Sequence, residues 1–417
     1  MLATCLLATA TTHAQTYDNA RGYHEDAARL VAREDTAGAL IQLRNALQLD
    51  PAHVPSLILM GQTLLDSGQP GEAVQMLSEA LLQGADPVLI LEPLTEGYLT
   101  QGRYAELLRD VPASSAPESI RPGIYAAHAQ AYLALGNIEQ AGNALHNALN
   151  LAPDNHSAKL VRVALDIRLG RLEQALQSAE ELINSDPEDA RAWNNYASAL
   201  HATGQVGPAI DAYRRAVDLA PGNTDARVAL VSLYMDLNRE TEATADIRYL
   251  EENAPLDPRG AYFRALAAAR AGDRETELNA LTVTVGVLDA LEPERVSGNP
   301  QLQMIGALAH VGLGAYAKAR VLLETYLAGH PDDIGAIRLL AGSLLALEDY
   351  ADVITLLAPL QRRYPRDANI TALLAAAYSS SEQPQKAADL LQSLEDAGSG
   401  ERASDRLLAT SLLDAGN

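Results

Sequence analysis

The chain has 417 residues, of which 48% are hydrophobic and only 4% aromatic, and its formal net charge at pH 7 is -23. So acidic a chain repels a phosphate backbone, which excludes nucleic acid as a partner class. Few aromatic residues, with Trp193 and Phe263 the single members of their types, favour helix-on-helix packing over a sheet.

The first 14 residues resemble a secretory signal peptide. An apolar run ends in Thr12-His13-Ala14, with small residues at the two positions that a signal peptidase inspects, so we expect cleavage after Ala14. The run is too short to span a bilayer, and no basic segment precedes it, as expected of a truncated N-terminus. The alternative is lipid attachment at Cys5, because Leu2-Ala3-Thr4-Cys5 loosely matches a lipobox.

From about residue 20 the sequence repeats every 34 residues, with glycine, alanine and proline each in a fixed phase. The glycines are Gly68, Gly102, Gly136, Gly170, Gly204 and Gly272, the alanines Ala39, Ala73, Ala141, Ala175, Ala209 and Ala243, and the prolines Pro51, Pro153, Pro187, Pro221 and Pro255. We expect two antiparallel helices per unit, because glycine allows a left-handed turn, small residues allow close helix contact and proline ends the second helix.

The first repeat is predicted at about residues 20–50, with apolar residues at helical spacing in its second helix at residues 39–47. Repeats two and three follow from Val54 and Val88, and the third ends in a predicted loop at residues 111–117. Repeats four to seven, at residues 122–255, are the most regular.

After Gly272 the next turn glycine is Gly314, one period plus eight residues further on. The eighth repeat is therefore predicted to have a second helix about two turns too long, followed by a loop before residue 300. This divides the chain into a first subarray at residues 20–277, an irregular helix and loop at 278–300, and a second subarray at 301–417. The irregularity is either a tolerated surface insertion or a bend and contact point.

Repeats nine to eleven keep the phase with Ala319, Pro331, Pro365 and Ala387, and the chain stops inside a twelfth repeat, whose first helix is expected at about residues 403–414. A 34-residue period is the signature of the tetratricopeptide repeat (TPR). The chain thus resembles TPR proteins, which implies an all-α, right-handed superhelix (α-solenoid) of about eleven helix-turn-helix repeats and almost no strand.

The TPR resemblance also implies an inner groove lined by positions 2, 5, 9 and 12 of each first helix. In repeats six to eight the groove residues are Arg191, Asn194, Ser198, His201, Asp225, Ser232, Met235, Arg259 and Tyr262. Asn and Arg can bind a peptide backbone or carboxylate, and Tyr or Met adds apolar contact, so we hypothesise that the groove holds an extended peptide. The competing interpretation is an ordinary solvated wall.

Longer phrases of the sequence resemble the TPR-repeat protein associated with PEP-CTERM and exosortase systems of Gram-negative bacteria. The phrases are Ala37-Gly38-Ala39-Leu40-Ile41-Gln42-Leu43-Arg44-Asn45-Ala46-Leu47-Gln48, Gly84-Ala85-Asp86-Pro87, Tyr98-Leu99-Thr100-Gln101-Gly102-Arg103-Tyr104, Arg338-Leu339-Leu340-Ala341 and Leu356-Leu357-Ala358-Pro359-Leu360. This resemblance implies an exported envelope protein tied to exopolysaccharide production and to sorting of proteins with a C-terminal anchor signal. Members are usually longer, so the end at Asn417 departs from the pattern.

Residue patterns for catalysis, metal binding and cofactor binding are not found. The nine histidines are dispersed, the glycines occur singly at helix ends, and acidic pairs such as Glu180-Glu181 fit solvated helix faces. We therefore expect no enzyme, cofactor or metal, but a scaffold that binds other envelope proteins in the periplasm or at the membrane facing it.

Three alternatives remain open at this stage. The array could be the regulatory or substrate-presenting part of an enzyme that continues beyond residue 417. A cytosolic co-chaperone is disfavoured because the Lys/Asn carboxylate clamp is not recognisable, and direct binding of an anionic polysaccharide is disfavoured by the charge. The oligomeric state is left open.

Overall fold

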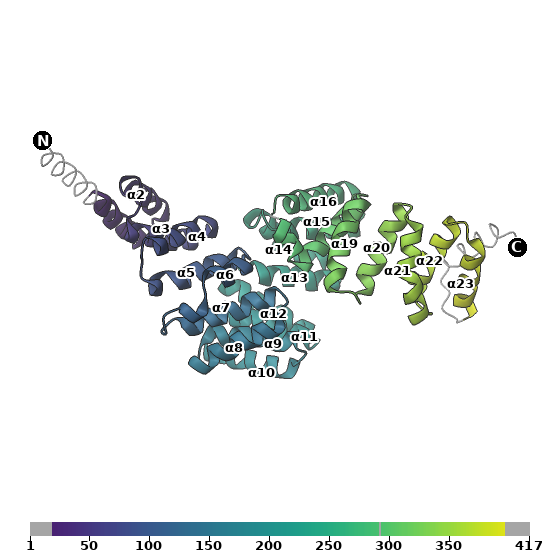
Figure 1. Ribbon diagram of the computed structural model, residues 1–417, viewed down its shortest axis with the longest axis horizontal. Helices are drawn as coiled ribbons and strands as arrows, with labels where there is room; N and C mark the ends of the chain where they lie inside the picture. The colour runs from purple at the N-terminus through teal and green to yellow at the C-terminus, as the bar shows by residue number, and fades with distance from the viewer. Residues whose placement is uncertain (1–18, 292, 397–417) are drawn as a thin grey trace. The chain divides into compact units, whose positions relative to one another are not determined.

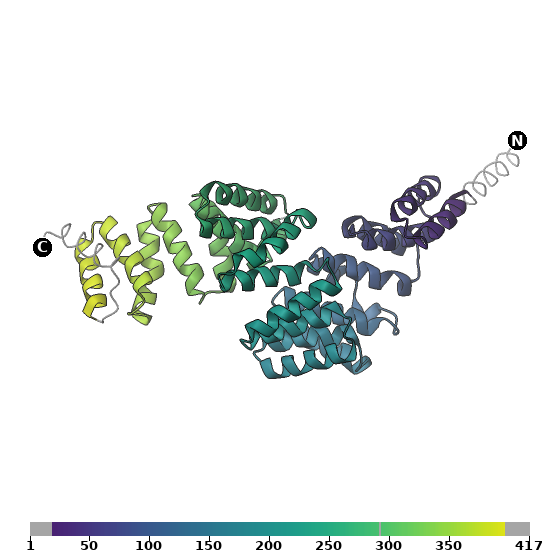
Figure 2. The same cartoon turned by 180° about the vertical axis from the view of Figure 1, so that it is seen from behind.

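The computed structural model describes residues 19–291 and 293–396, so the predicted signal peptide, Cys5 and the predicted helix at 403–414 lie outside the described residues. Within them the chain is a tandem series of antiparallel α-helices without a strand (Figures 1 and 2), which confirms the all-α TPR solenoid class. Its contacts define two compact units, Met1–Pro221 and Gly222–Asn417. The segment at 278–300 lies inside the second unit.

The first unit is built from consecutive helix pairs. After a helix at residues 19–31 it contains α2 (Thr36–Leu49), α3 (Val54–Asp66), α4 (Pro70–Leu82), α5 (Pro87–Thr100), α6 (Tyr104–Asp110), the 3-10 turn η1 (Ala113–Ser115), α7 (Arg121–Ala134), α8 (Ile138–Leu151), α9 (His156–Arg168), α10 (Leu172–Ser185), α11 (Ala190–Ala202) and α12 (Val206–Leu219).

The second unit continues the same pattern. It contains α13 (Thr224–Asp236), α14 (Glu240–Asn253), α15 (Pro258–Ala271), α16 (Arg274–Asp289), α17 (Pro293–Ser297), α18 (Pro300–Gly312), α19 (Tyr316–Gly329), α20 (Ile334–Ala346), α21 (Tyr350–Arg363), α22 (Ala368–Ser380) and α23 (Pro384–Asp396).

The turn between the two helices of a repeat has one backbone geometry, whichever residue occupies it. All the turn glycines have a positive φ, for example 79° at Gly204. The 34-residue phase also falls on Glu34, Asn238, Glu348 and Glu382, whose φ angles are 61°, 55°, 63° and 59°. The amide of Glu348 donates to the Leu345 carbonyl, as that of Gly204 does to His201. Helix packing therefore imposes the left-handed turn even where the residue disfavours it.

In most repeats an alanine lies five residues after the turn, on the side of the second helix that faces the first. Ala39, Ala73, Ala141, Ala175, Ala209 and Ala243 are all 0% exposed. The same phase also holds Leu107 and Val353, which are 0% exposed as well, so this position is buried in these repeats but is not restricted to alanine.

Connections between repeats combine a helix-ending proline with a capping side chain. Helices α2 and α8 end two residues before Pro51 and Pro153, as predicted. The next helix then begins at an Asp or Asn whose side chain accepts a backbone N–H, a pattern that recurs at Asp86, Asn155, Asp189, Asn223, Asp257, Asn299, Asp333 and Asp367. Each such cap contributes about 1 kcal/mol to helix stability.

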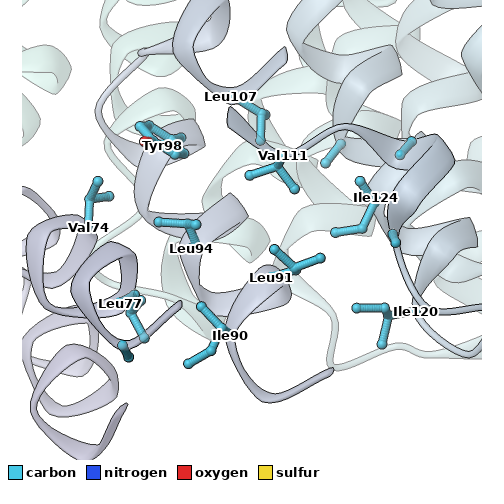
Figure 3. Packing of buried hydrophobic residues seen from close by; sticks show 14 of the residues in the cluster. Val74, Leu77, Ile90, Leu91, Leu94, Tyr98, Leu107, Val111, Ile120 and Ile124 are labelled. Carbon is cyan, nitrogen blue, oxygen red and sulfur yellow. The ribbon is translucent and has the colours of Figure 1, made fainter. Parts of the chain in front are cut away.

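The third repeat has an irregular second half, as the predicted loop at 111–117 indicated. Helix α6 has only 7 residues, and the chain then crosses η1 before α7 begins. Helix α7 holds this segment, because His128 Nε2 lies 2.7 Å from the Val111 carbonyl oxygen and Arg121 donates to the Ala116 carbonyl. Figure 3 shows the core beneath it, with Val111 and Leu107 beside the α5 side chains Leu91 and Leu94.

The prediction that the second helix of the eighth repeat is about two turns too long was wrong. Helix α16 has 16 residues, against 14 in α12 and α14, so it is not extended by two turns. The additional residues instead form the separate short helix α17, which begins at Pro293. A proline lacks the amide N–H that a continuing helix needs, which explains why the inserted residues start a new helix.

We predict that Glu348→Gly stabilises the array by about 1 kcal/mol, because glycine adopts the left-handed turn without the steric cost that glutamate bears. The urea midpoint of the full chain should rise. Asn238→Gly should give a smaller gain, since asparagine tolerates this conformation. Glu181→Gly, inside α10, should instead lose about 1 kcal/mol. A lower midpoint for Glu348→Gly would contradict an imposed turn.

Candidate protein-binding surface

Four of the predicted groove residues form a polar stripe along α11, in the first unit. Arg191, Asn194, Ser198 and His201 follow one another at spacings of three and four residues, so they share one face of the helix. Arg191 and His201 are exposed, whereas Asn194 and Ser198 are half-buried. Whether these four side chains bind a partner stays a prediction.

The rest of α11 is anchored so that this stripe has a fixed direction. The Trp193 indole N–H donates to the Pro187 carbonyl at 2.8 Å, and Asn195 Nδ2 donates to the Leu160 carbonyl of α9 at 2.9 Å. At the N-terminus, the Asp189 side chain accepts the Arg191 amide and contacts His156 Nε2 at 2.5 Å. Burial favours a higher pKa for Asp189, but these hydrogen bonds outweigh it and lower its pKa below the ordinary value.

Within the α11 stripe, one buried side-chain atom lacks a hydrogen-bond partner. The Asn194 Oδ1 atom is buried and has no hydrogen-bond partner. The neighbouring Ser198 hydroxyl does have hydrogen-bond partners. It donates to the backbone carbonyl of Asn194 and lies 2.9 Å from the Tyr213 hydroxyl. A buried acceptor without a partner costs free energy, so the amide of Asn194 gains from any group that supplies a donor.

The other five groove residues lie on α13 and α15, in the second unit, and they do not form an equivalent stripe. Asp225 is exposed and Ser232 half-buried on α13, but Val228 between them is 6% exposed. Met235 is only 2% exposed, which corrects its assignment to the groove surface. Arg270 of α15 donates to the Met235 carbonyl, so the following repeat covers this turn of α13.

Arg259 on α15 is held by two carboxylates. Its guanidinium donates to Asp257 at 2.6 Å and, across to the preceding repeat, to Asp225 at 3.2 Å. The Arg259 side chain is 19% exposed and the Asp225 side chain 77%. Burial acts to lower the pKa of Arg259, but the carboxylates raise it above the ordinary value, so the charge is fixed.

Tyr262 lies one turn further along α15 and is half-buried against the core side chains Leu281 and Leu302. Burial raises the pKa of its phenol. Asp225 and Asp257 share the single Arg259 cation, so this cluster keeps a net negative charge, whereas Arg191 of the α11 stripe is 68% exposed with the Asp189 carboxylate 3.6 Å away. The 34-residue separation puts Asp225 and Arg259 at the same position of neighbouring repeats, but periodicity alone does not show that the two side chains meet.

Metal-ligand clusters and membrane spans are both absent from the described part of the chain. In residues 19–291 and 293–396 no three His, Cys, Asp or Glu side chains are grouped so as to hold a metal ion. Among the helices of these same residues, none combines the length and apolarity that a bilayer span requires.

Comparison with known families agrees with the repeat geometry. Tetratricopeptide-repeat models match residues 30–89, 122–155, 163–224 and 310–377, together more than half of the chain. The chain belongs to the tetratricopeptide-repeat proteins, whose repeats generally mediate protein–protein interaction. TPR scaffolds are typically non-enzymatic. No curated protein matches the sequence.

Three solved structures are similar. The APC/C hetero-tetramer Cut9–Hcn1 aligns at 12% identity with a TM-score of 0.44, covering 98% of this chain and 99% of that chain. The P58(IPK) TPR domain aligns at 14% identity with a TM-score of 0.31, covering 95% and 98%. MamA aligns at 20% identity with a TM-score of 0.33, covering 39% and 94%.

We predict that Arg259→Ala destabilises the second unit by about 2 kcal/mol, because it leaves the partly buried Asp257 carboxylate without its cation. Asp225→Asn should cost less than about 0.5 kcal/mol, since Asp225 is exposed and solvent screens its charge. Urea unfolding of the two variants measures the difference. Equal losses would mean that the pair across the repeats, not Asp257, holds Arg259 in place.

Proposed function

We propose that this protein is a non-enzymatic interaction scaffold of the bacterial cell envelope, and that it serves exopolysaccharide export or PEP-CTERM protein sorting. The general part of this proposal, binding of protein partners, follows from the TPR family. The envelope role rests on the sequence phrases that resemble the PEP-CTERM-associated TPR protein and on the signal-peptide pattern that ends at Ala14.

The observation that carries the choice of binding surface is the α11 stripe. Its four side chains offer a cation, an amide, a hydroxyl and an imidazole on one helix face, and the amide has an unsatisfied buried oxygen. An extended peptide presents backbone N–H and C=O groups at regular intervals, which such a row of short polar side chains can bind.

Binding through this stripe is tested by capture from a detergent-solubilised envelope fraction of the native bacterium. Wild-type protein should enrich specific envelope proteins, and the double variant Arg191→Ala with Asn194→Ala should reduce that enrichment about tenfold. The matched control is Arg214→Ala, which removes an exposed arginine from the second helix of the same repeat. Helical circular dichroism and melting should be unchanged in all three.

The outcomes separate the parts of the proposal. Loss of capture only in the double variant supports the α11 stripe as the contact surface. Equal capture by all variants would remove the α11 stripe from the site but keep the scaffold, whereas no envelope protein above background would end the scaffold proposal.

Export is tested separately, at the N-terminus. If the segment before Gln15 is a signal peptide, mass spectrometry of the periplasmic fraction should detect a mature chain that begins at Gln15. Ala14→Arg should block this processing, because a signal peptidase needs a small residue there. A fatty-acylated N-terminus at Cys5 would show instead that the lipidation alternative is correct, and an unprocessed cytoplasmic chain would refute export.

A further inference from the structure

The junction between the first and second repeats departs from the capping pattern of the later ones. At most of the repeat junctions an Asp or Asn caps the incoming helix, but α3 begins at His53, whose side chain makes no capping hydrogen bond. The His53 ring is instead turned onto Ser56, with Nδ1 2.8 Å from the hydroxyl oxygen. At this junction an imidazole, whose charge changes near neutral pH, thus takes the place of an Asp or Asn cap, whose charge does not change there.

A second imidazole packs against it. His24, on the helix at residues 19–31, meets the His53 ring edge-to-face, with ring centroids 5.6 Å apart. His53 is 3% exposed, and His24 Nδ1 is buried without a hydrogen-bond partner. The two rings connect the first helix of repeat one directly to the first helix of repeat two.

The surroundings of this pair favour neutral rings. Among the described residues, the carboxylates whose charge acts on them are Glu25, on the same helix as His24, and Asp50, in the turn before His53. Both are already engaged, since Glu25 accepts from Arg21 at 3.0 Å and Asp50 accepts the Ala52 amide at 3.1 Å. Neither carboxylate therefore compensates fully for a positive charge on the rings.

The resulting pH dependence has a definite sign. Burial lowers the pKa of both histidines below the ordinary value of 6.5, and His53 lowers that of His24 further. The unfolded or released segment therefore binds more protons than the packed one when the pH falls below about 6.5. The stabilising effect of the neutral pair is present above that pH and is lost as the pH falls toward the lowered pKa values.

The same junction holds the hydrophobic contact of the first helix. Ala27, one turn after His24, packs in a cluster with Leu40 and Leu43 of α2 and Met60 and Leu64 of α3. Ala20, on the same helix as Ala27, is also 0% exposed, and because alanine side chains bury little surface, the histidine pair supplies larger side chains to this junction. Release of this helix would expose Met60 and Leu64.

We propose that His24 and His53 form an acid-sensitive latch, which ties the first helix of the array to the second repeat and releases it on protonation. The consequence is an array whose first helix separates from the second repeat under mildly acidic conditions. The latch belongs to the first repeat junction and does not depend on the α11 stripe.

The test is hydrogen–deuterium exchange of the full chain at about pH 7.5 and about pH 5.5, in buffer with EDTA, with rates corrected for the intrinsic effect of pH. In the wild type, protection of residues 20–31 should fall at least about tenfold at the lower pH, while α11 stays protected. His53→Asn should remove this change, because it supplies the Asn cap of the other junctions and no second imidazole.

Two further variants make the result specific. His24→Gln should also remove the pH response of residues 20–31, whereas His146→Gln should retain it, since His146 lies exposed on α8. The latch is refuted if the wild type keeps its protection at about pH 5.5, or if His53→Asn loses it as the wild type does.

Discussion

The structure depends on one constraint, the close crossing of two helices joined by a left-handed turn. The side chain five residues after the turn, a buried alanine in most repeats, lies between the two helices, and the turn must reverse the chain within a few residues. Glu34, Glu348 and Glu382 adopt the same φ as the glycines, although glutamate alone disfavours it. The packing of neighbouring repeats therefore determines the backbone conformation of the turn, and the residue type at the turn does not.

This constraint also decides which side chains remain for binding. Stacking buries most apolar residues of each repeat between its own helices and the next pair, so that recognition is left to helix faces outside these contacts. A given repeat position can be exposed in one repeat and buried in another. His201 on α11 is exposed, whereas Met235, its equivalent on α13, lies under a contact from Arg270. A binding surface in such an array therefore has to be established for each repeat separately.

Sequence periodicity was sufficient for the fold but only partly for the candidate site. The fixed phases of Gly, Ala and Pro predicted helix pairs, buried alanines and helix ends, because each depends on local stereochemistry repeated every 34 residues. It did not reveal the Asp225–Arg259 pair or the burial of Met235, which depend on contacts between repeats. It also placed the eight additional residues in a longer helix, since helical composition does not show where Pro293 starts a new one.

The Asp and Asn caps are part of the sequence repeat, because Asn155, Asp189, Asn223 and Asp257 share the 34-residue phase as strictly as the glycines. Their side chains keep one charge state across the physiological pH range, so those junctions respond little to mild acid. His53 occupies the same phase. One substitution within a repeated pattern therefore gives a single junction a property that the other junctions lack, and the regularity of the array is what makes the exception visible.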